Sequence, residues 1–402
     1  MPELFKLLSV FGLILILLRL KWNLGLVMLI GAATLGLLVG IAPYDILTIA
    51  YKSCIAVSAI TLVVALALIM VLENVLRNTG TLKKLVASSS GLLGDNRIVM
   101  ALMPAIIGIL PSAGGAFFSA PLVEESSGGC CYDKDRKAFI NYWFRHIWEY
   151  ISPLYPGFIM AAAISGVSMG RLFLVQVAFP ITVLATGALY GFRDIRPAAP
   201  AADRKARTKD LVSMLASGSP ILAVMALVMA AGVNIAVAMV IVVAGLFAYF
   251  RYGPSKILVT LKESLSVKTL VLVVGVLVFQ GVMEGSGVGA QIAAYFRAVG
   301  VPVVVILFLL PFLVGLTTGI TLAFVGVTFP MVVPLIGGAH PDLGMLAFAF
   351  ASGFAGVMFS PVHLCLVLTK DYFETELSPI YRTMLVPEAI VVAVAAIQMW
   401  VI

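Results

Sequence analysis

Long apolar segments follow one another along almost the whole chain, separated by short polar or glycine-rich stretches. Apolar helices of this length can cross the roughly 30 Å hydrocarbon core of a bilayer. The pattern therefore predicts an all-α polytopic membrane protein. About ten spanning helices are expected, near 5–20, 23–41, 54–77, 141–165, 171–191, 211–230, 233–250, 268–284, 344–368 and 384–402.

The second half of the chain repeats features of the first. A shift of 207 residues places Gly108 on Gly315 and Pro180 on Pro387, and a shift of 208 places Ser152-Pro153 on Ser360-Pro361. Two halves that interrupt their apolar segments at equivalent places are typical of inverted-repeat transporters. We expect repeat 1 at 1–191, an exposed linker at 192–210 and repeat 2 at 211–402.

Composition and charge support a membrane location. Hydrophobic residues make up 62% of the chain and charged residues 11%, and the mean hydropathy is +1.12. These values exclude an ordinary soluble domain. With the linker in the cytoplasm, nearly all 26 Lys and Arg residues fall on the cytoplasmic side, so the net charge of +7 is assigned to membrane orientation and not to nucleic acid. We expect an inner-membrane protein of a prokaryote with both termini outside.

Two stretches, 97–126 and 301–337, are too polar and too rich in glycine for simple spans, and are predicted to be re-entrant hairpins. Backbone unwound at membrane depth must be buried in protein or line a wet cavity. The end of one arm offers carbonyls to a cation, and the start of the next offers N–H groups to an anion. The alternative is that small residues only allow close helix contact. The expected binding residues at the two tips are Pro111, Ser112, Ala113, Gly114 and Gly115, and Thr317, Thr318, Gly319 and Thr321.

The span after each hairpin, near 141–165 and 344–368, contains proline and is predicted to be a broken helix. The two breaks and two tips are expected to form facing half-sites near the membrane midplane. The binding residues expected from the breaks are Ser152, Pro153, Tyr155, Ser360, Pro361 and His363.

Few ionisable residues lie near these breaks. His146 and Glu149 are three residues apart and would share a helical face. Together with His363 they are candidates for carrying a coupling proton, while Ser112 and Thr318 are candidates for Na⁺ at the hairpin tips. The alternatives are an interfacial belt that includes Arg145 and His146, and a structural hydrogen bond for His363.

No Lys or Arg is expected at the midplane, so a bound anion would be held by N–H groups and hydroxyls. The four cysteines, Cys54, Cys130, Cys131 and Cys365, have no metal or disulfide spacing. The sequence therefore predicts no transition-metal site.

The stretch Leu110-Pro111-Ser112-Ala113-Gly114-Gly115 and the repeated hairpin-and-break pattern resemble the ion transporter superfamily. That group includes dicarboxylate/sodium symporters, citrate and gluconate permeases and arsenite efflux carriers. The resemblance is greatest to the gluconate-permease side and to a related uncharacterised family of prokaryotic membrane proteins. Dicarboxylate symporters carry Ser-Asn-Thr at both tips, and this chain does not. The resemblance implies a homodimer in which a transport domain moves across the bilayer against a scaffold domain, as an elevator.

We therefore expect a secondary active transporter of a small organic anion, a carboxylate or sugar acid, coupled to Na⁺ or H⁺ and needing no organic cofactor. The alternatives are an efflux carrier for arsenite or an inorganic oxyanion, and a passive channel. The sequence contains neither a His-Glu-x-x-His nor a Gly-x-Ser-x-Gly motif, and no nucleotide-binding loop. An enzyme is not predicted.

Overall fold

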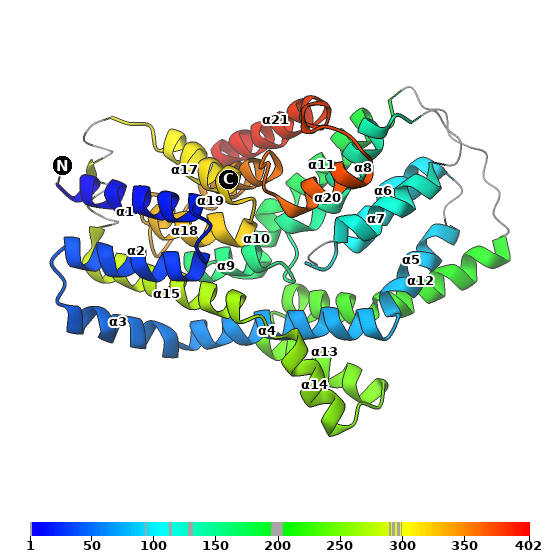
Figure 1. Cartoon of the computed structure of the whole chain (residues 1–402), viewed down its shortest axis with the longest axis horizontal. Helices are drawn as coiled ribbons and strands as arrows, with labels where there is room; N and C mark the ends of the chain where they lie inside the picture. Colours follow the sequence, from blue (N-terminus) through cyan, green and yellow to red (C-terminus); the bar gives the residue numbers. More distant parts are fainter. Residues whose placement is uncertain are drawn as a thin grey trace.

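The computed structural model is described for residues 2–92, 95–111, 115–127, 132–193, 204–288 and 300–402, with the single residues 291, 294, 295 and 298. All regular structure in these segments is helical, as expected (Figure 1). Five helical stretches are long and apolar enough to cross a membrane alone: Val57–Asn78, Met169–Gly191, Thr208–Ala230, Val267–Ser286 and Leu377–Val401. Shorter apolar helices accompany them, so this is a multi-pass membrane protein.

Twelve elements form the first half of the chain. They are α1 (Pro2–Arg19), α2 (Leu24–Leu38), α3 (Pro43–Ile55), α4 (Val57–Asn78), α5 (Thr81–Leu92), α6 (Asn96–Ile107), α7 (Gly115–Ser126), α8 (Lys134–Arg145), the 3₁₀ turn η1 (Ile147–Tyr150), α9 (Pro156–Ser165), α10 (Met169–Gln176) and α11 (Ala178–Gly191).

Ten elements are described in the second half. It contains α12 (Arg204–Met225), the π-helical η2 (Ala226–Ala230), α13 (Ile235–Tyr249), α14 (Pro254–Ser264), α15 (Val267–Ser286), α17 (Val303–Thr318), α18 (Thr321–Leu335), α19 (Leu343–Met358), α20 (Leu364–Tyr372) and α21 (Leu377–Val401).

Helix ends follow ordinary local chemistry. The side chain of Asn23 accepts hydrogen bonds from the second and third backbone N–H groups of α2, and Asp133 and Asp342 cap α8 and α19 in the same way. Pro43 and Pro156 stand at the first position of α3 and α9, where a missing N–H leaves no helical hydrogen bond unmade. These caps place the starts of the helices that surround the polar centre.

Two boundaries differ from expectation and one agrees with it. Helix α3 was not predicted, because Asp45 and Lys52 interrupt its apolar pattern. The expected span 171–191 corresponds to the apolar stretch Met169–Gly191, in which α10 and α11 meet at Val177. Helix α12 begins at Arg204, inside the expected linker, because the Arg, Lys and Ala residues that made this stretch look like a tether also favour helix. Residues 194–203 of that linker lie outside the described segments.

Contacts made by the helix pair α6–α7 of the first half have counterparts made by the helix pair α17–α18 of the second half. Helix α6 lies against α8, and α17 lies against α19. Helix α7 contacts α20, while α18 contacts α9. Helix α2 contacts α15, and α13 contacts α4. In Figure 1 the pair α6–α7 lies to the right of α9 and α20, and the pair α17–α18 to their left.

The core lies where these helix pairs meet the interrupted helices. Helix α18 is buried from Thr321 to Val333 and α19 from Leu346 to Met358. The peripheral helices instead expose apolar side chains, for example Leu47, Val57 and Ile241. Such surfaces are suited to lipid, while polar backbone is confined to the interior.

Candidate functional site

Both helices that follow the helix pairs are interrupted. Helix α8 ends at Arg145, η1 follows, and α9 begins only at Pro156. Helix α19 ends at Met358 and α20 begins at Leu364. Pro153 and Pro361 lie in these gaps, which we call break 1 (151–155) and break 2 (359–363), and their rings cannot donate a helical hydrogen bond.

The tip between α17 and α18 lies directly on break 2. Gly319 has a left-handed φ of +64°, and a Cβ there would come within 2.8 Å of the backbone nitrogen of His363. The Gly319 carbonyl is also 2.6 Å from Nδ1 of His363. Glycine is required at this tip both for its dihedral angle and for the close approach.

Residues on either side of break 1, in the first half of the chain, contact Thr321 next to the same tip. The hydroxyl of Thr321, at the start of α18, donates to Oε2 of Glu149 over 2.5 Å, and both residues are buried. A Cβ on Gly157, in the first turn of α9, would meet the Thr321 methyl at 2.5 Å. The Tyr142 hydroxyl donates to the Met358 carbonyl at the end of α19 over 3.0 Å. Residues from both halves thus form one buried polar junction.

The first helix pair, α6–α7, also contacts break 1. The Tyr155 hydroxyl donates to the Gly108 carbonyl, and the Trp148 indole donates to the Ala105 carbonyl over 2.8 Å. A Cβ on Gly108 would collide with the carbonyl of Arg145. The tip residues Ser112, Ala113 and Gly114 lie outside the described segments, between Pro111 and a buried Gly115 that begins α7.

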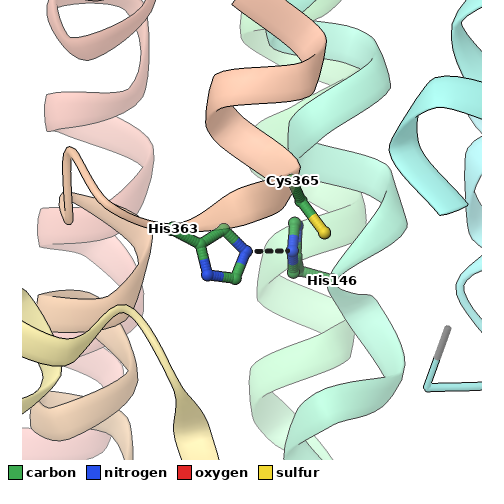
Figure 2. Close-up of side chains that lie close together, drawn as sticks. All are labelled: His146, His363 and Cys365. Carbon is green, nitrogen blue, oxygen red and sulfur yellow. Dashed lines mark hydrogen bonds between the residues drawn. The ribbon is translucent and has the colours of Figure 1, made fainter. Parts of the chain in front are cut away.

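Two histidine rings face one another at the centre of the junction (Figure 2). His146 follows the last residue of α8 and His363 precedes α20, and their Nε2 atoms are 3.0 Å apart. Nδ1 of His146 is 2.6 Å from the Tyr142 carbonyl, so each Nδ1 has a backbone carbonyl partner. Oε1 of Glu149 is 3.8 Å from Nε2 of His146.

Arg145 corrects one expectation. An interfacial belt is one of the alternatives for it, yet Arg145 is buried within the protein and only 3% exposed. The reason is that α8 begins at Lys134 instead of near residue 141, so Arg145 stands at the inner end of the helix. It interacts there with Glu149 and Cys365.

The other expected site residues divide into two groups. The junction brings together His146, Glu149, Gly319, Thr321, Ser360 and His363. The hydroxyls of Thr317 and Thr318 instead bond back to the carbonyls of Leu313 and Val314 in their own helix. Ser152 accepts from the backbone N–H of Leu154 within break 1, next to a buried Pro153.

The junction reaches the surface at break 2. Pro361 and Val362 are exposed there, and so are Thr317 and Ile320 at the neighbouring tip. Break 1 is buried from Ile151 to Tyr155. Break 2 is therefore partly exposed at the surface of the protein, while break 1 is enclosed by other helices.

Two cavities lie near opposite ends of α4. One, of about 550 Å³, is lined by apolar residues of α5, α6 and α7 with Glu73, Arg77 and Lys83 at its polar side. The other, of about 1080 Å³, includes Ser58 and Thr61 at the start of α4, together with Arg171. Both cavities therefore have apolar walls with one or a few charged side chains, which in the first cavity are of both signs because Glu125 also lines it.

Sequence reasoning missed a buried acid. Glu388 on α21 is only 1% exposed, and within the described segments no positively charged side chain forms an ion pair with its carboxyl group. The Tyr150 hydroxyl, just before break 1, is its polar neighbour. The available signal was a single acidic residue in an apolar span, directly after Pro387 of the repeat.

Comparison with solved structures shows a related fold. The crystal structure of the Alcanivorax borkumensis YdaH transporter, described as having an unusual topology, superposes with a TM-score of 0.56 at 16% sequence identity. The match covers 84% of this chain and 84% of that one. No curated protein sequence matches.

A family model matches nearly the whole chain. The matched region is residues 3–402, and the family is described as a protein of unknown function, DUF401. The chain belongs to this family.

Proposed function

We propose that this protein is a secondary active transporter of a small organic anion, a carboxylate or sugar acid. One observation carries the proposal. A tip between two helices and two helix breaks, contributed by both halves of the chain, meet in one buried polar junction. Transporters bind substrates at such interruptions, where unwound backbone exposes N–H and C=O groups inside the membrane.

The reciprocal contacts support an inverted repeat. Helices α8 and α19 contact the first arm of their own helix pair, whereas α9 and α20 each contact the second arm of the other pair. The equivalent residues Gly108 and Gly315 make equivalent close approaches, to the carbonyls of Arg145 and Gly353. In our proposal the two helix pairs are re-entrant and the repeats have opposite orientation.

The proposed anion site includes Arg145. A guanidinium in a buried site can form two parallel hydrogen bonds to a carboxylate, and it keeps its charge where a lysine can lose it. Arg145 lies beside break 1, within the junction that Thr321 and His363 also line. A small carboxylate at this place would contact both halves of the chain.

The proposed route is alternating access between the two membrane faces. The cavities at opposite ends of α4 would be the two vestibules. Helices α6–α11 and α17–α21 would form the transport domain and move as an elevator against α1–α4 and α12–α15. A homodimer formed through that scaffold would hold the fixed part in place.

We propose a proton as the coupling ion, carried by Glu388. An ionised carboxylate buried in a membrane protein without a positive partner is expensive, and the polar neighbour of Glu388 is the neutral hydroxyl of Tyr150, so a buried Glu388 would hold a proton. Release of the proton would require a conformation that opens α21 to water. Sodium at the hairpin tips, with Ser112 and Thr318 as ligands, is the competing assignment.

A thermal-stability screen of the purified protein tests the binding part of the proposal. A ligand that binds only the folded state raises the melting temperature by mass action. We expect one class of organic anion, tested among mono- and dicarboxylates and sugar acids, to raise it in wild type and in Arg19→Gln, at the exposed end of α1, but not in Arg145→Gln. A response only to arsenite or sulfate would favour the efflux alternative. A response dependent on Na⁺ would contradict proton coupling.

A further inference from the structure

A cluster of nitrogen and sulfur ligands occupies the space between the two breaks. The rings of His146 and His363 face one another, with the side chain of Cys365 beside His146 (Figure 2), and one ligand atom of each lies within 4.8 Å of the others. His146 and His363 are buried, and Cys365 is half-buried in the first turn of α20. The two histidines are separated by 217 residues, so no local spacing in the sequence could have indicated the cluster.

The hydrogen bonds of the two rings fix their tautomers. A backbone carbonyl can only accept, so the Nδ1 atoms facing the carbonyls of Tyr142 and Gly319 must both carry hydrogen. Neutral rings would then turn two bare Nε2 lone pairs toward each other across 3.0 Å. That arrangement is repulsive unless a cation lies between or beside the two nitrogens.

We propose that His146, His363 and Cys365 bind a transition-metal ion of the zinc class. Zinc–nitrogen bonds of about 2.05 Å would subtend roughly 95° across the observed Nε2 separation, close to the tetrahedral angle after a small opening. The thiolate of Cys365 supplies the third ligand. Imidazole and thiolate favour Zn²⁺, Co²⁺ or Cu⁺ over the oxygen-seeking ions Na⁺, Mg²⁺ and Ca²⁺.

The surroundings of the rings suit metal binding. Ligating histidines characteristically donate their other N–H to a carbonyl or carboxylate, which fixes the ring and strengthens the ligand nitrogen. Here the Tyr142 carbonyl and the Gly319 carbonyl have this role. The Tyr142 ring also packs edge-on against both imidazoles, with centroid distances of 4.7 and 5.7 Å.

Some charged neighbours of the cluster oppose metal binding and others favour it. Arg145 interacts with Cys365 and adds positive charge, which opposes a second cation. Glu149, with Oε1 3.8 Å from Nε2 of His146, and the Cys365 thiolate together offset the guanidinium and part of the metal charge. Three ligands leave one coordination position, which water or Glu149 can fill.

The bound ion would tie the two halves of the chain together. His146 belongs to the end of α8, and the other two ligands belong to break 2 and α20. Because this arrangement exists only in the folded state, the ion would raise the melting temperature.

The test uses full-length purified protein, stripped with a chelator and dialysed, with Cys54, Cys130 and Cys131 replaced by serine. We expect one Zn²⁺ per chain by metal analysis and a raised melting temperature. Co²⁺ should give the visible bands of a tetrahedral site and a sulfur-to-metal charge-transfer band. His146→Gln, His363→Gln and Cys365→Ser should each weaken Zn²⁺ binding at least tenfold, and Cys365→Ser should remove the charge-transfer band.

His340→Gln is the matched control, because His340 is an exposed histidine outside the cluster. It should bind Zn²⁺ as the parent does, and size-exclusion profiles should show that all variants remain folded. Failure of the parent protein to bind Zn²⁺ or Co²⁺, or equal binding by folded ligand variants, would overturn the proposal and leave a shared proton between the rings. Transport is not a readout here, so the outcome is independent of the proposed function.

Discussion

At the scale of single residues, the chemistry of the junction depends on contacts between distant parts of the chain. The sequence indicated His146, Glu149, Thr321 and His363, because polar residues beside proline or glycine in an apolar span are conspicuous. It could not indicate which of them meet. It also missed Arg145, whose depth depends on where α8 begins, and Cys365, whose histidine partners lie beyond any local spacing.

Gly319 tests the contact between tip and break. Gly319→Ala should reduce stability by more than the roughly 1–2 kcal/mol expected for a left-handed backbone alone, because the added Cβ also meets the backbone of His363. Gly338→Ala is the control, since Gly338 has a similar φ of +62° with nothing within 4 Å. Thermal unfolding in detergent measures both, and equal losses would contradict the close approach.

Thr321 tests the hydrogen bond between the halves. Thr321→Val keeps the shape but leaves Oε2 of Glu149 without its hydroxyl donor, so we expect a loss of about 1–3 kcal/mol. The control is Thr328→Val on the same helix. It removes only a hydroxyl that donates to the Phe324 carbonyl of its own helix. If the two variants unfold at the same temperature, the Thr321–Glu149 hydrogen bond contributes no more to stability than a hydrogen bond within one helix.

At the scale of elements, proline and glycine act locally, so helix interruptions are visible in a sequence. The two breaks fall within the expected broken spans, and helix pairs occupy 96–126 and 303–335 within a residue or two of the expected hairpins. Local signals fail where polarity and helix propensity conflict. Helix α3 and the early start of α12 are both built from charged, helix-favouring stretches that resemble loops.

Two equivalent glycines test the repeated contact between helices. Gly108→Ala and Gly315→Ala should each destabilise the protein by several kcal/mol, because a Cβ at either position collides with a backbone carbonyl of the interrupted helix. Gly245→Ala in α13 meets nothing within 4 Å and should be neutral or slightly stabilising. A neutral result at only one of the pair would argue against equivalent roles in the two halves.

At the scale of the whole molecule, apolar patterning predicted the helical membrane architecture, and the likeness to the YdaH transporter fold agrees with it. The orientation of the repeats, the elevator motion and the dimer remain predictions. Hydrophobic periodicity indicates which residues avoid water but not which helices pack together. It therefore could not predict that α7 contacts α20 and α18 contacts α9.

Glu388 tests proton coupling. In reconstituted vesicles, Glu388→Gln should retain exchange of labelled for unlabelled substrate but lose accumulation driven by a proton gradient, because a permanently neutral side chain cannot carry the proton. Glu263→Gln on α14, outside the junction, is the control. Full accumulation by Glu388→Gln would assign coupling to another group.

The most direct test of the central claim is accumulation of a labelled organic anion, chosen by the thermal-stability screen, in proteoliposomes with an imposed proton gradient. We predict that wild-type protein raises the internal concentration above the external one, that a protonophore abolishes this accumulation, and that Arg145→Gln shows none. Flux that only equalises the two concentrations, unaffected by the protonophore, would contradict secondary active transport and indicate a channel.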